Sequence, residues 1–213
     1  MKIFRDICNS YGVNSYLLVG KDGTGVLIDP AFQNELELNE LQNRIQENKV
    51  SLKAIIATHT HADHIMGTKL VVDAYPTAAF LIHKEGEPLY KTANDYSMIM
   101  GFKKREFPNP TGYVEDGEML QFSDIELQVL YTPGHAPGSI CLYNKADNVV
   151  FTGDVLFNSS IGRTDLQGGS FEVLQKSIRE KLYTLSPDTL VLTGHGDSTS
   201  IGFEKENNPY VRG

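Results

Sequence analysis

Four side chains of the kinds that bind metal ions fall within one stretch of seven residues. The stretch, residues 58–64, reads Thr-His-Thr-His-Ala-Asp-His and contains His59, His61, Asp63 and His64. Imidazole nitrogens and carboxylate oxygens are ligands that zinc and similar divalent cations prefer in proteins. A helix start capped by Asp63 would explain one acidic residue, but not the three histidines around it. The segment therefore indicates a metal site.

The residues on either side of this cluster predict how it is positioned. Residues 52–58 form a short apolar run that is typical of a buried strand, and a helix is expected over 65–75. Residues two apart in an extended chain face the same side, so His59 and His61 can share one ion. The two donors that follow project in a new direction as the chain turns into the helix. One segment can therefore serve two adjacent ions.

Three further donors each follow a strand-like run and stand in a tight turn. His135 lies in Thr-Pro-Gly-His-Ala-Pro-Gly-Ser, Asp154 ends Val-Val-Phe-Thr-Gly-Asp, and His195 lies in Leu-Thr-Gly-His-Gly-Asp. Loops at strand ends are where folds commonly place functional groups. Asp154 on its own would be an ordinary turn residue. Beside the histidines it completes a set of seven donors, which is enough for two ions if Asp154 bridges them.

The remaining periodicities predict an α/β protein. Alternating runs over 15–19 and 24–28 flank Lys-Asp-Gly and predict a hairpin. Amphipathic helices are expected over 35–48 and after Ser170, with Phe171, Leu174, Ile178 and Leu182 on one face of the second. Further short strands are expected at 77–82, 119–122, 125–130, 140–143 and 148–151. This pattern favours two mixed sheets covered by helices, a four-layer αββα sandwich with the metals at the edge between the sheets.

Composition limits the classes of function. The chain has 213 residues and no linker-like stretch, so one domain over 1–213 is expected. The net charge is −8, the pI is about 5.2 and no basic block occurs, so nucleic acid is not an expected partner. No run approaches the roughly 18 to 20 apolar residues of a membrane span, and residues 1–20 do not form a secretory signal. Cys8 and Cys141 lie far apart, which indicates reduced thiols in a cytoplasmic protein.

The order of the motifs resembles the metallo-β-lactamase fold family. The His-x-His-x-Asp-His cluster, the Pro-Gly-His turn, the Gly-Asp turn and the late Gly-His turn follow one another from about residue 10 to the C-terminus. The resemblance implies two metal ions with one set of ligands each. The first set is His59, His61 and His135, the second is Asp63, His64 and His195, and Asp154 and a hydroxide lie between the ions.

One branch of that family is more similar to this chain than others. The run Ile-Gly-Arg-Thr-Asp at 161–165 resembles glyoxalase II, and the ending after Gly194 is similar to its short bacterial members. The likeness implies a metal-dependent hydrolase of a small acyl thioester, most of all S-hydroxyacylglutathione, with Asp63 and Asp154 in the catalytic centre. Larger glyoxalase II enzymes carry a C-terminal helical domain with basic contacts to glutathione. Few residues follow His195, so we expect that domain to be missing here.

The charge of such a centre suits acyl transfer. Two Zn²⁺ ions balanced by Asp63, Asp154 and a hydroxide leave a net charge of about +1, which stabilises an anionic tetrahedral intermediate. Zinc is the expected metal, with iron or manganese as alternatives. The fold family also contains persulfide dioxygenases, which use one iron held by two histidines and one aspartate, and lactonases. RNA-processing nucleases and a metal-binding protein without turnover fit less well.

Several other residues have two interpretations. Asp29 either orients a ligand histidine or is a plain turn residue. Arg163 and Asp165 either brace the site or hold an anionic group of the substrate, unless they only form an internal salt bridge. His83 is expected to be structural. The segment 84–118 is either a lid over the site or, as we prefer from the sequence, a solvated helical excursion.

Overall fold

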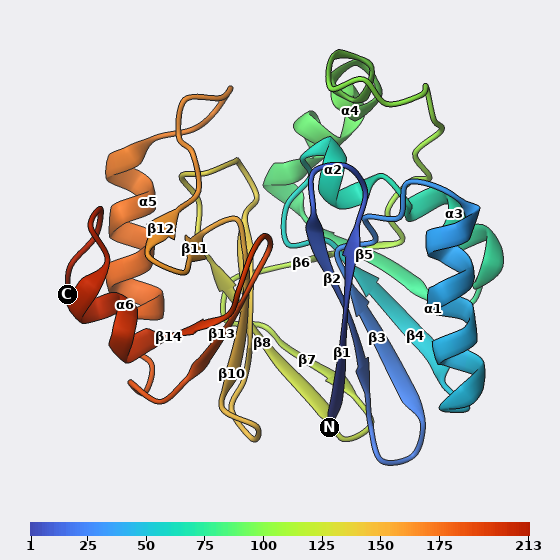
Figure 1. Cartoon of the computed structure of the whole chain (residues 1–213), viewed down its shortest axis with the longest axis horizontal. Helices are drawn as coiled ribbons and strands as arrows, with labels where there is room; N and C mark the ends of the chain where they lie inside the picture. Colours follow the sequence, from blue (N-terminus) through green and yellow to red (C-terminus); the bar gives the residue numbers. More distant parts are fainter.

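Two six-stranded sheets form the centre of the molecule in the computed structural model, which describes residues 1–213 (Figure 1). The first sheet consists of β1 (Lys2–Cys8), β2 (Val13–Val19), β3 (Thr24–Ile28), β4 (Ser51–Ile56), β5 (Ala79–His83) and β6 (Gly112–Val114), in that order. The second consists of β7 (Met119–Phe122), β8 (Ile125–Tyr131), β9 (Ile140–Asn144), β10 (Val149–Gly153), β13 (Leu190–Thr193) and β14 (Thr199–Ser200). Its order is β14-β13-β10-β9-β8-β7, and a separate hairpin pairs β11 (Leu156–Phe157) with β12 (Ser160–Ile161).

Both sheets are mixed, as predicted. Strands β3, β4, β5 and β6 run parallel to one another, whereas β1, β2 and β3 are joined antiparallel. In the second sheet β10 and β13 are parallel and the other pairs are antiparallel. Parallel strands end at the same edge of a sheet, so the loops after β3 and β4 leave together, as do those after β10 and β13. These four loops contain most of the predicted site.

Helices cover the outer face of each sheet (Figure 1). On the first sheet these are α1 (Glu35–Glu47) and α3 (Thr68–Ala74), and on the second α5 (Phe171–Ser177), a short π-helical segment (Ile178–Leu182) and α6 (Ile201–Asn207). Two more helices, α2 (Ala62–Ile65) and α4 (Glu87–Ile99), lie at the edge of the sandwich, α4 preceded by a 3₁₀ turn (Lys84–Gly86). The layers are therefore helix, sheet, sheet and helix, which confirms the predicted architecture.

The strands are apolar on both faces because both faces are buried. In β2, Leu17 belongs to the cluster of 20 buried residues beneath α1, while Leu18 belongs to the 15 residues between the sheets. In β10, Val150 joins the third cluster, beneath α5 and α6, and its neighbour Phe151 points to the space between the sheets. Alternate residues thus fill two cores, which explains continuous apolar runs without a polar face.

Most predicted elements are present, and the structure differs from the predictions in several places. The helix expected over 65–75 is interrupted at Gly67, because the amide of this residue donates to the Pro30 carbonyl at 2.7 Å. Phe32 lies so close to Gly67 that a side chain would not fit there. Phe171 does not share the buried face of its helix and is 40% exposed. Strand β1 was not predicted from the sequence.

The two cysteines are not paired with each other. Cys8 and Cys141 are both free and buried, and burial raises the pKa of the Cys141 thiol to about 12. Neither thiol is activated as a nucleophile. None of the helices is both long enough and apolar enough to cross a membrane.

Candidate metal centre

The seven predicted donors meet at the edge where the two sheets face each other. Three sets of donor atoms, each within 4.8 Å of one another, could hold a metal ion: His59, His61 and His135; His59, His64 and Asp154; and Asp63, His64 and His195. Strand β4 ends at Ile56, so His59 and His61 lie in the following loop and not in an extended strand as expected. Their rings still come together, edge to face, with centroids 4.8 Å apart.

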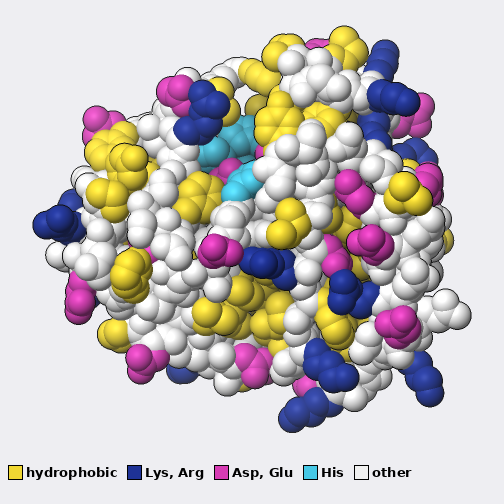
Figure 2. Space-filling view, in the orientation of Figure 1, with side chains coloured by type: hydrophobic (Ala, Val, Ile, Leu, Met, Phe, Trp, Pro, Cys, Tyr) yellow, Lys and Arg dark blue, Asp and Glu magenta, His cyan; other side chains and the backbone are white.

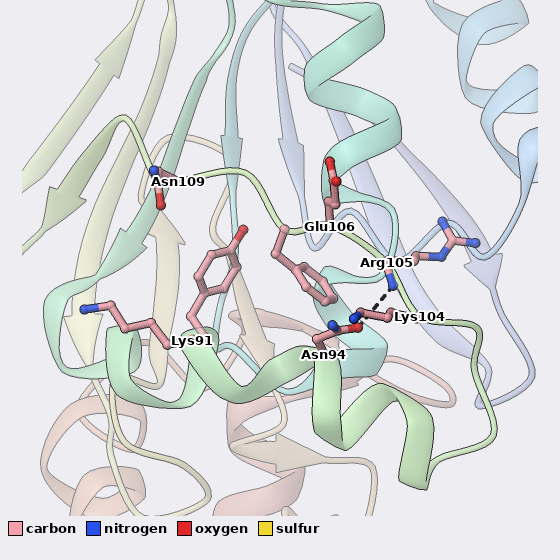
Figure 3. A pocket seen from close by; sticks show the side chains of 8 residues that line it. Lys91, Asn94, Lys104, Arg105, Glu106 and Asn109 are labelled. Carbon is pink, nitrogen blue, oxygen red and sulfur yellow. Dashed lines mark hydrogen bonds between the residues drawn. The ribbon is translucent and has the colours of Figure 1, made fainter.

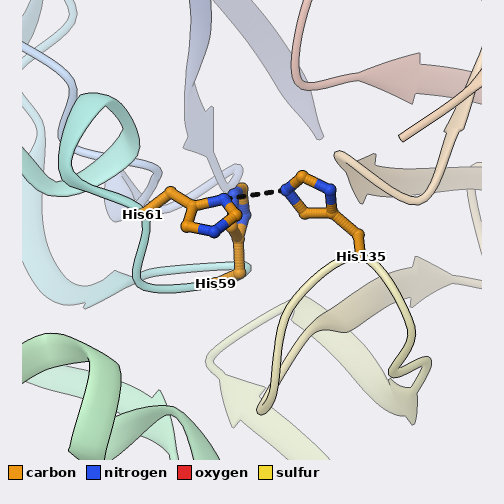
Figure 4. A group of neighbouring side chains, drawn as sticks. All are labelled: His59, His61 and His135. Carbon is orange, nitrogen blue, oxygen red and sulfur yellow. Dashed lines mark hydrogen bonds between the residues drawn. The ribbon is translucent and has the colours of Figure 1, made fainter. Parts of the chain in front are cut away.

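The first set combines one loop from each sheet. His59 and His61 come from the loop after β4, and His135 comes from the loop after β8 (Figure 4). The Nδ1 atom of His61 lies 2.8 Å from Nε2 of His135. The Nε2 atom of His59 is buried and has no hydrogen-bond partner.

The set of Asp63, His64 and His195, called the second set from here on, lies beside the first, and Asp154 lies between the two. Nε2 of His64 is 3.2 Å from Nε2 of His195, which is in turn 3.6 Å from Oδ2 of Asp63. The Asp154 carboxylate places Oδ1 at 3.2 Å from His64 Nε2 and Oδ2 at 3.7 Å from His135 Nε2. Asp154 therefore contacts a histidine of each set, which is the position of a bridging ligand.

Backbone carbonyls orient two of the histidines. Nδ1 of His135 is 2.8 Å from the Arg163 carbonyl, and Nδ1 of His195 is 3.1 Å from the Tyr11 carbonyl. A carbonyl oxygen only accepts, so each Nδ1 must carry a proton and donate it. In the neutral ring, Nε2 then presents a lone pair toward the centre.

Asp29 orients the rings of His64 and His59. This carboxylate is 1% exposed, accepts from the Thr58 amide at 2.7 Å and hydroxyl at 2.8 Å, and lies 2.9 Å from Nδ1 of His64. Because the Thr58 hydroxyl proton is used by Asp29, its oxygen accepts from Nδ1 of His59 at 3.1 Å. Asp29 thus occupies the position expected of a carboxylate that orients ligand histidines.

These contacts fit divalent metal ions. With Nδ1 as the donor in four rings, neutral imidazoles direct Nε2 lone pairs toward one another and toward the carboxylates, and Nε2 of His59 and Oδ1 of Asp154 have no hydrogen-bonding partner. Buried acceptors without donors are costly unless a cation lies between them. A Cβ atom at Gly194 would lie 2.3 Å from Asp154 Oδ1, so the chain also leaves space there for the carboxylate.

When no metal is bound, protons on the histidines balance the negative charge of the carboxylates. Burial alone would lower the pKa of His64, but Asp154 and Asp29 outweigh burial and raise that pKa well above its ordinary value. Burial also opposes the shift at His195, where hydrogen bonds to Asp154 and Asp63 raise the pKa to about 9. Metal ions bound at Nε2 would displace these protons.

The remaining predicted residues lie around the centre. Arg163 forms a bidentate salt bridge with Asp165 at 2.7 and 2.8 Å, and these side chains are 61% and 68% exposed. Arg163 supports the donor set through its backbone carbonyl, which orients His135. The sequence could not predict this contact, because every residue has a carbonyl. His83 stacks on Tyr131 with ring centroids 4.4 Å apart and belongs to none of the three donor sets.

A cleft of about 430 Å³ opens beside the donors and is bounded by α4. Figure 2 shows the histidines at the bottom of a hollow whose rim carries apolar side chains. Helix α4 and the residue that follows it contribute Leu89, Ala93, Tyr96, Ile99 and Met100 to the lining. The preferred interpretation of residues 84–118 as a solvated excursion was therefore wrong, because one face of the helix forms a wall of the site.

Helix α4 is tied to the metal-binding loops at both ends. The Thr60 hydroxyl, between two of the histidines in sequence, donates to the Gly86 carbonyl at 2.9 Å just before the helix begins. At the other end, the Tyr11 hydroxyl donates to the Met100 carbonyl at 3.1 Å. The carbonyl of the same Tyr11 accepts from His195.

A larger cavity of about 740 Å³ lies on the other side of α4 (Figure 3). Its cations are mostly engaged elsewhere: Lys91 pairs with Glu87 at 2.7 Å, and the Arg105 guanidinium donates to the Gln33 and Met66 carbonyls. It contains none of the grouped metal donors. The chemistry of the molecule is therefore located in the smaller cleft.

Comparison with known proteins agrees with this geometry. The profile described as "Metallo-beta-lactamase superfamily" matches residues 9–195. The chain belongs to the metallo-β-lactamase superfamily. It is 37% identical over 201 residues to "Probable metallo-hydrolase YqgX" of Bacillus subtilis, covering 94% of this chain and 92% of that protein. It is 32% identical over 199 residues to the hydroxyacylglutathione hydrolase GloC of Haemophilus influenzae, covering 93% and 92%.

Solved structures show the same fold. The B3 metallo-β-lactamase BLEG-1 superposes with a TM-score of 0.89 at 32% identity, covering all of both chains. TTHA1623 in a di-iron-bound form gives 0.88 at 33% identity, covering 98% of this chain and all of the other. ETHE1 from Myxococcus xanthus gives 0.80 at 27% identity, covering 98% and 84%. Proteins with different names therefore share this architecture.

Proposed function

We propose that this protein is a metal-dependent hydrolase that cleaves small acyl thioesters, S-hydroxyacylglutathione among them. The observation that carries the proposal is the convergence of seven donors beside an open cleft, with four imidazoles oriented by partners at Nδ1. Similarity to a hydroxyacylglutathione hydrolase supports the thioester class. The free, buried cysteines of the present protein suit a reducing cytoplasm.

We infer one set of ligands for each of two metal ions. The first is His59, His61 and His135, the second is Asp63, His64 and His195, and Asp154 is shared. When bound, divalent cations at such a site lower the pKa of water to about 7 and polarise a carbonyl oxygen. We favour zinc, with iron or manganese as alternatives, and a similar protein is known in a di-iron form.

The side chains of the protein supply the other requirements. Hydrolysis forms a C–O bond, breaks the C–S bond and moves a proton from water to the departing thiolate. Burial opposes ionisation of Asp63, but a hydrogen bond to His195 and the charge of His64 outweigh it and lower the pKa of this carboxyl. Asp63 is therefore an ionised group in the cleft lining, as a ligand of the second ion must be.

A second candidate is an iron-dependent persulfide dioxygenase. The set His59, His64 and Asp154 contains two histidines and one aspartate, the ligand types that this reaction requires, and the chain is similar to ETHE1. A lactonase would need the same hydrolytic centre with an oxygen leaving group.

One purified sample assayed in two ways separates these functions. Loss of S-lactoylglutathione is followed in one assay, and oxygen uptake with glutathione persulfide in the other. We expect thioester hydrolysis without oxygen uptake. Oxygen uptake without thioester cleavage by an iron-loaded protein would overturn the proposal, and lactone hydrolysis alone would replace the substrate class.

A further inference from the structure

One wall of the cleft is apolar and has no part in holding the metal donors. It is made by the face of α4 that carries Leu89, Ala93, Tyr96 and Met100, whose spacing of three or four residues places them on one side of a helix. Ile99 lies at the rim of the same wall and is 80% exposed. The cleft thus pairs a polar floor of histidines and carboxylates with a hydrocarbon surface.

Apolar side chains that face solvent also stand on the other sides of this cleft. Tyr11 and Leu166 line it and are 45% and 39% exposed. Single exposed apolar residues are ordinary, but a group that surrounds one cleft next to a reactive centre is typical of a binding surface.

The cleft offers little to a charged thiol carrier. Arg163 is the only lysine or arginine in its lining, and both arms of that guanidinium contact Asp165. The acidic residues of the lining, Asp63 and Asp154, belong to the donor set. A carrier with carboxylates, such as glutathione, therefore finds no free cation in the lining of the cleft.

We propose that the α4 wall binds the acyl chain of the substrate, and that the preferred substrates are thioesters of apolar acyl groups several carbons long. This inference rests on the proposed thioesterase function and specifies its substrate class. Thiol carriers of the peptide type are chains of polar amides, so the acyl chain is the part of the substrate that a hydrocarbon wall matches. The scissile carbonyl then lies over the donors while the carrier extends toward solvent.

A series of acyl groups on one neutral carrier tests this assignment. Acetyl, butyryl and hexanoyl thioesters of N-acetylcysteamine differ only in hydrocarbon length. Burying a methylene is worth enough for kcat/KM to rise about fourfold per added carbon until the wall is covered. Values that stay within twofold across the series would overturn the assignment. A glutathione ester more than tenfold better than the N-acetylcysteamine ester of the same acyl group would also overturn it.

Two adjacent residues of α4 give a matched pair of variants. Ile99 lines the cleft, whereas Met98 does not, and both are more than half exposed, so neither change threatens folding. Ile99→Ser should reduce the gain from acetyl to hexanoyl by about threefold or more, and Met98→Ser should leave it unchanged. Equal effects of the two changes would contradict a specific acyl wall.

Binding without turnover separates the two proposals. S-alkyl thioethers of N-acetylcysteamine cannot be hydrolysed, and their binding to the purified protein is measured by calorimetry. We expect affinity to increase with alkyl length and the heat capacity of binding to become more negative, the sign of apolar burial. Graded thioether binding with no hydrolysis of any thioester would reject the hydrolase but keep the wall. Hydrolysis with ungraded binding would reject the wall alone.

Discussion

The floor and the wall of the cleft are built in different ways. In the floor, His59, His64, His135 and His195 each have one nitrogen held by a second group while the other points to the centre. The wall is a helix tied to its surroundings by a few side-chain hydrogen bonds, and several of its apolar residues face solvent. A preorganised floor suits one fixed type of chemistry, and a wall with solvent-facing side chains suits variation in the substrate.

This difference has a consequence for substitutions. A change in the floor should alter metal content and slow every substrate, because all substrates meet the same donors. A change in the wall should alter the order of preference among substrates and leave metal content intact. Experiments at both places can show whether the two regions are as separate as the contacts indicate.

The largest effect is expected from Asp154→Ala. This change removes the carboxylate that contacts a histidine of each set, so two cations would face each other without their shared anion. Activity should fall on the order of 10³-fold or more, and both ions should be lost, as measured by kinetics and elemental analysis. The unaltered protein should contain about two equivalents of metal. Asp188→Ala, at an exposed position outside the cleft lining, is the control, and retention of one site at full occupancy in Asp154→Ala would show that Asp154 is no bridge.

A drop in pH should weaken metal binding strongly. The pKa of His195 is raised to about 9 and that of His64 is raised as well. With no metal bound, both rings therefore keep their second proton to a higher pH than an ordinary histidine does. Each displaced proton makes the apparent affinity fall by up to about tenfold per pH unit as the pH decreases from 8 to 6. Competition titration with a chelator measures the slope. A slope of zero would mean that neither histidine binds the ion.

Asp29→Asn should weaken binding of the ion at the second set, which includes His64, more than binding of the other ion. The amide keeps the size of the side chain and tolerates the positive φ of 52° at this position, but it weakens the partner of His64 Nδ1. Loss of such an outer contact usually lowers metal affinity about 10- to 100-fold. Elemental analysis after graded dialysis is the measurement, and Asp22→Asn, at an exposed turn, is the control. Equal loss of both ions would show that Asp29 supports the whole centre.

The smallest effect is expected in the wall. Tyr96 donates its hydroxyl to Gln167 Oε1 at 2.8 Å across the cleft, in an exposed position. Tyr96→Phe removes a hydrogen bond worth about 0.5 kcal/mol, so KM should rise about twofold with metal content unchanged. Tyr113→Phe, on β6, is the control. A loss of metal in Tyr96→Phe would contradict the independence of wall and floor.

The donors could be predicted from the sequence because their signal is local. Four of them are close together in 58–64, and His135, Asp154 and His195 each follow an apolar run and stand beside glycine. The sandwich could be predicted because strands buried on both faces leave long apolar runs between turns. These patterns depend only on neighbours in the chain.

Other features depend on distant contacts and could not be predicted. The carbonyls of Tyr11 and Arg163 orient two histidines, and a carbonyl is present in every residue. Strand β1 is an edge strand with charged residues such as Arg5, which hide its alternation. Gly67 separates α2 from α3 at a point where Pro30 and Phe32 come close to it from another segment.

Thr60 joins the two regions through its hydrogen bond to Gly86. The bond fixes the loop that carries His59 and His61 to the residue before α4. Linkage is reciprocal, so a molecule seated on α4 must change the affinity for the metal by the same factor by which the metal changes the affinity for that molecule. If wall and floor are independent, as their separate contacts indicate, that factor is one, and metal affinity measured with and without a bound thioether tests the independence directly.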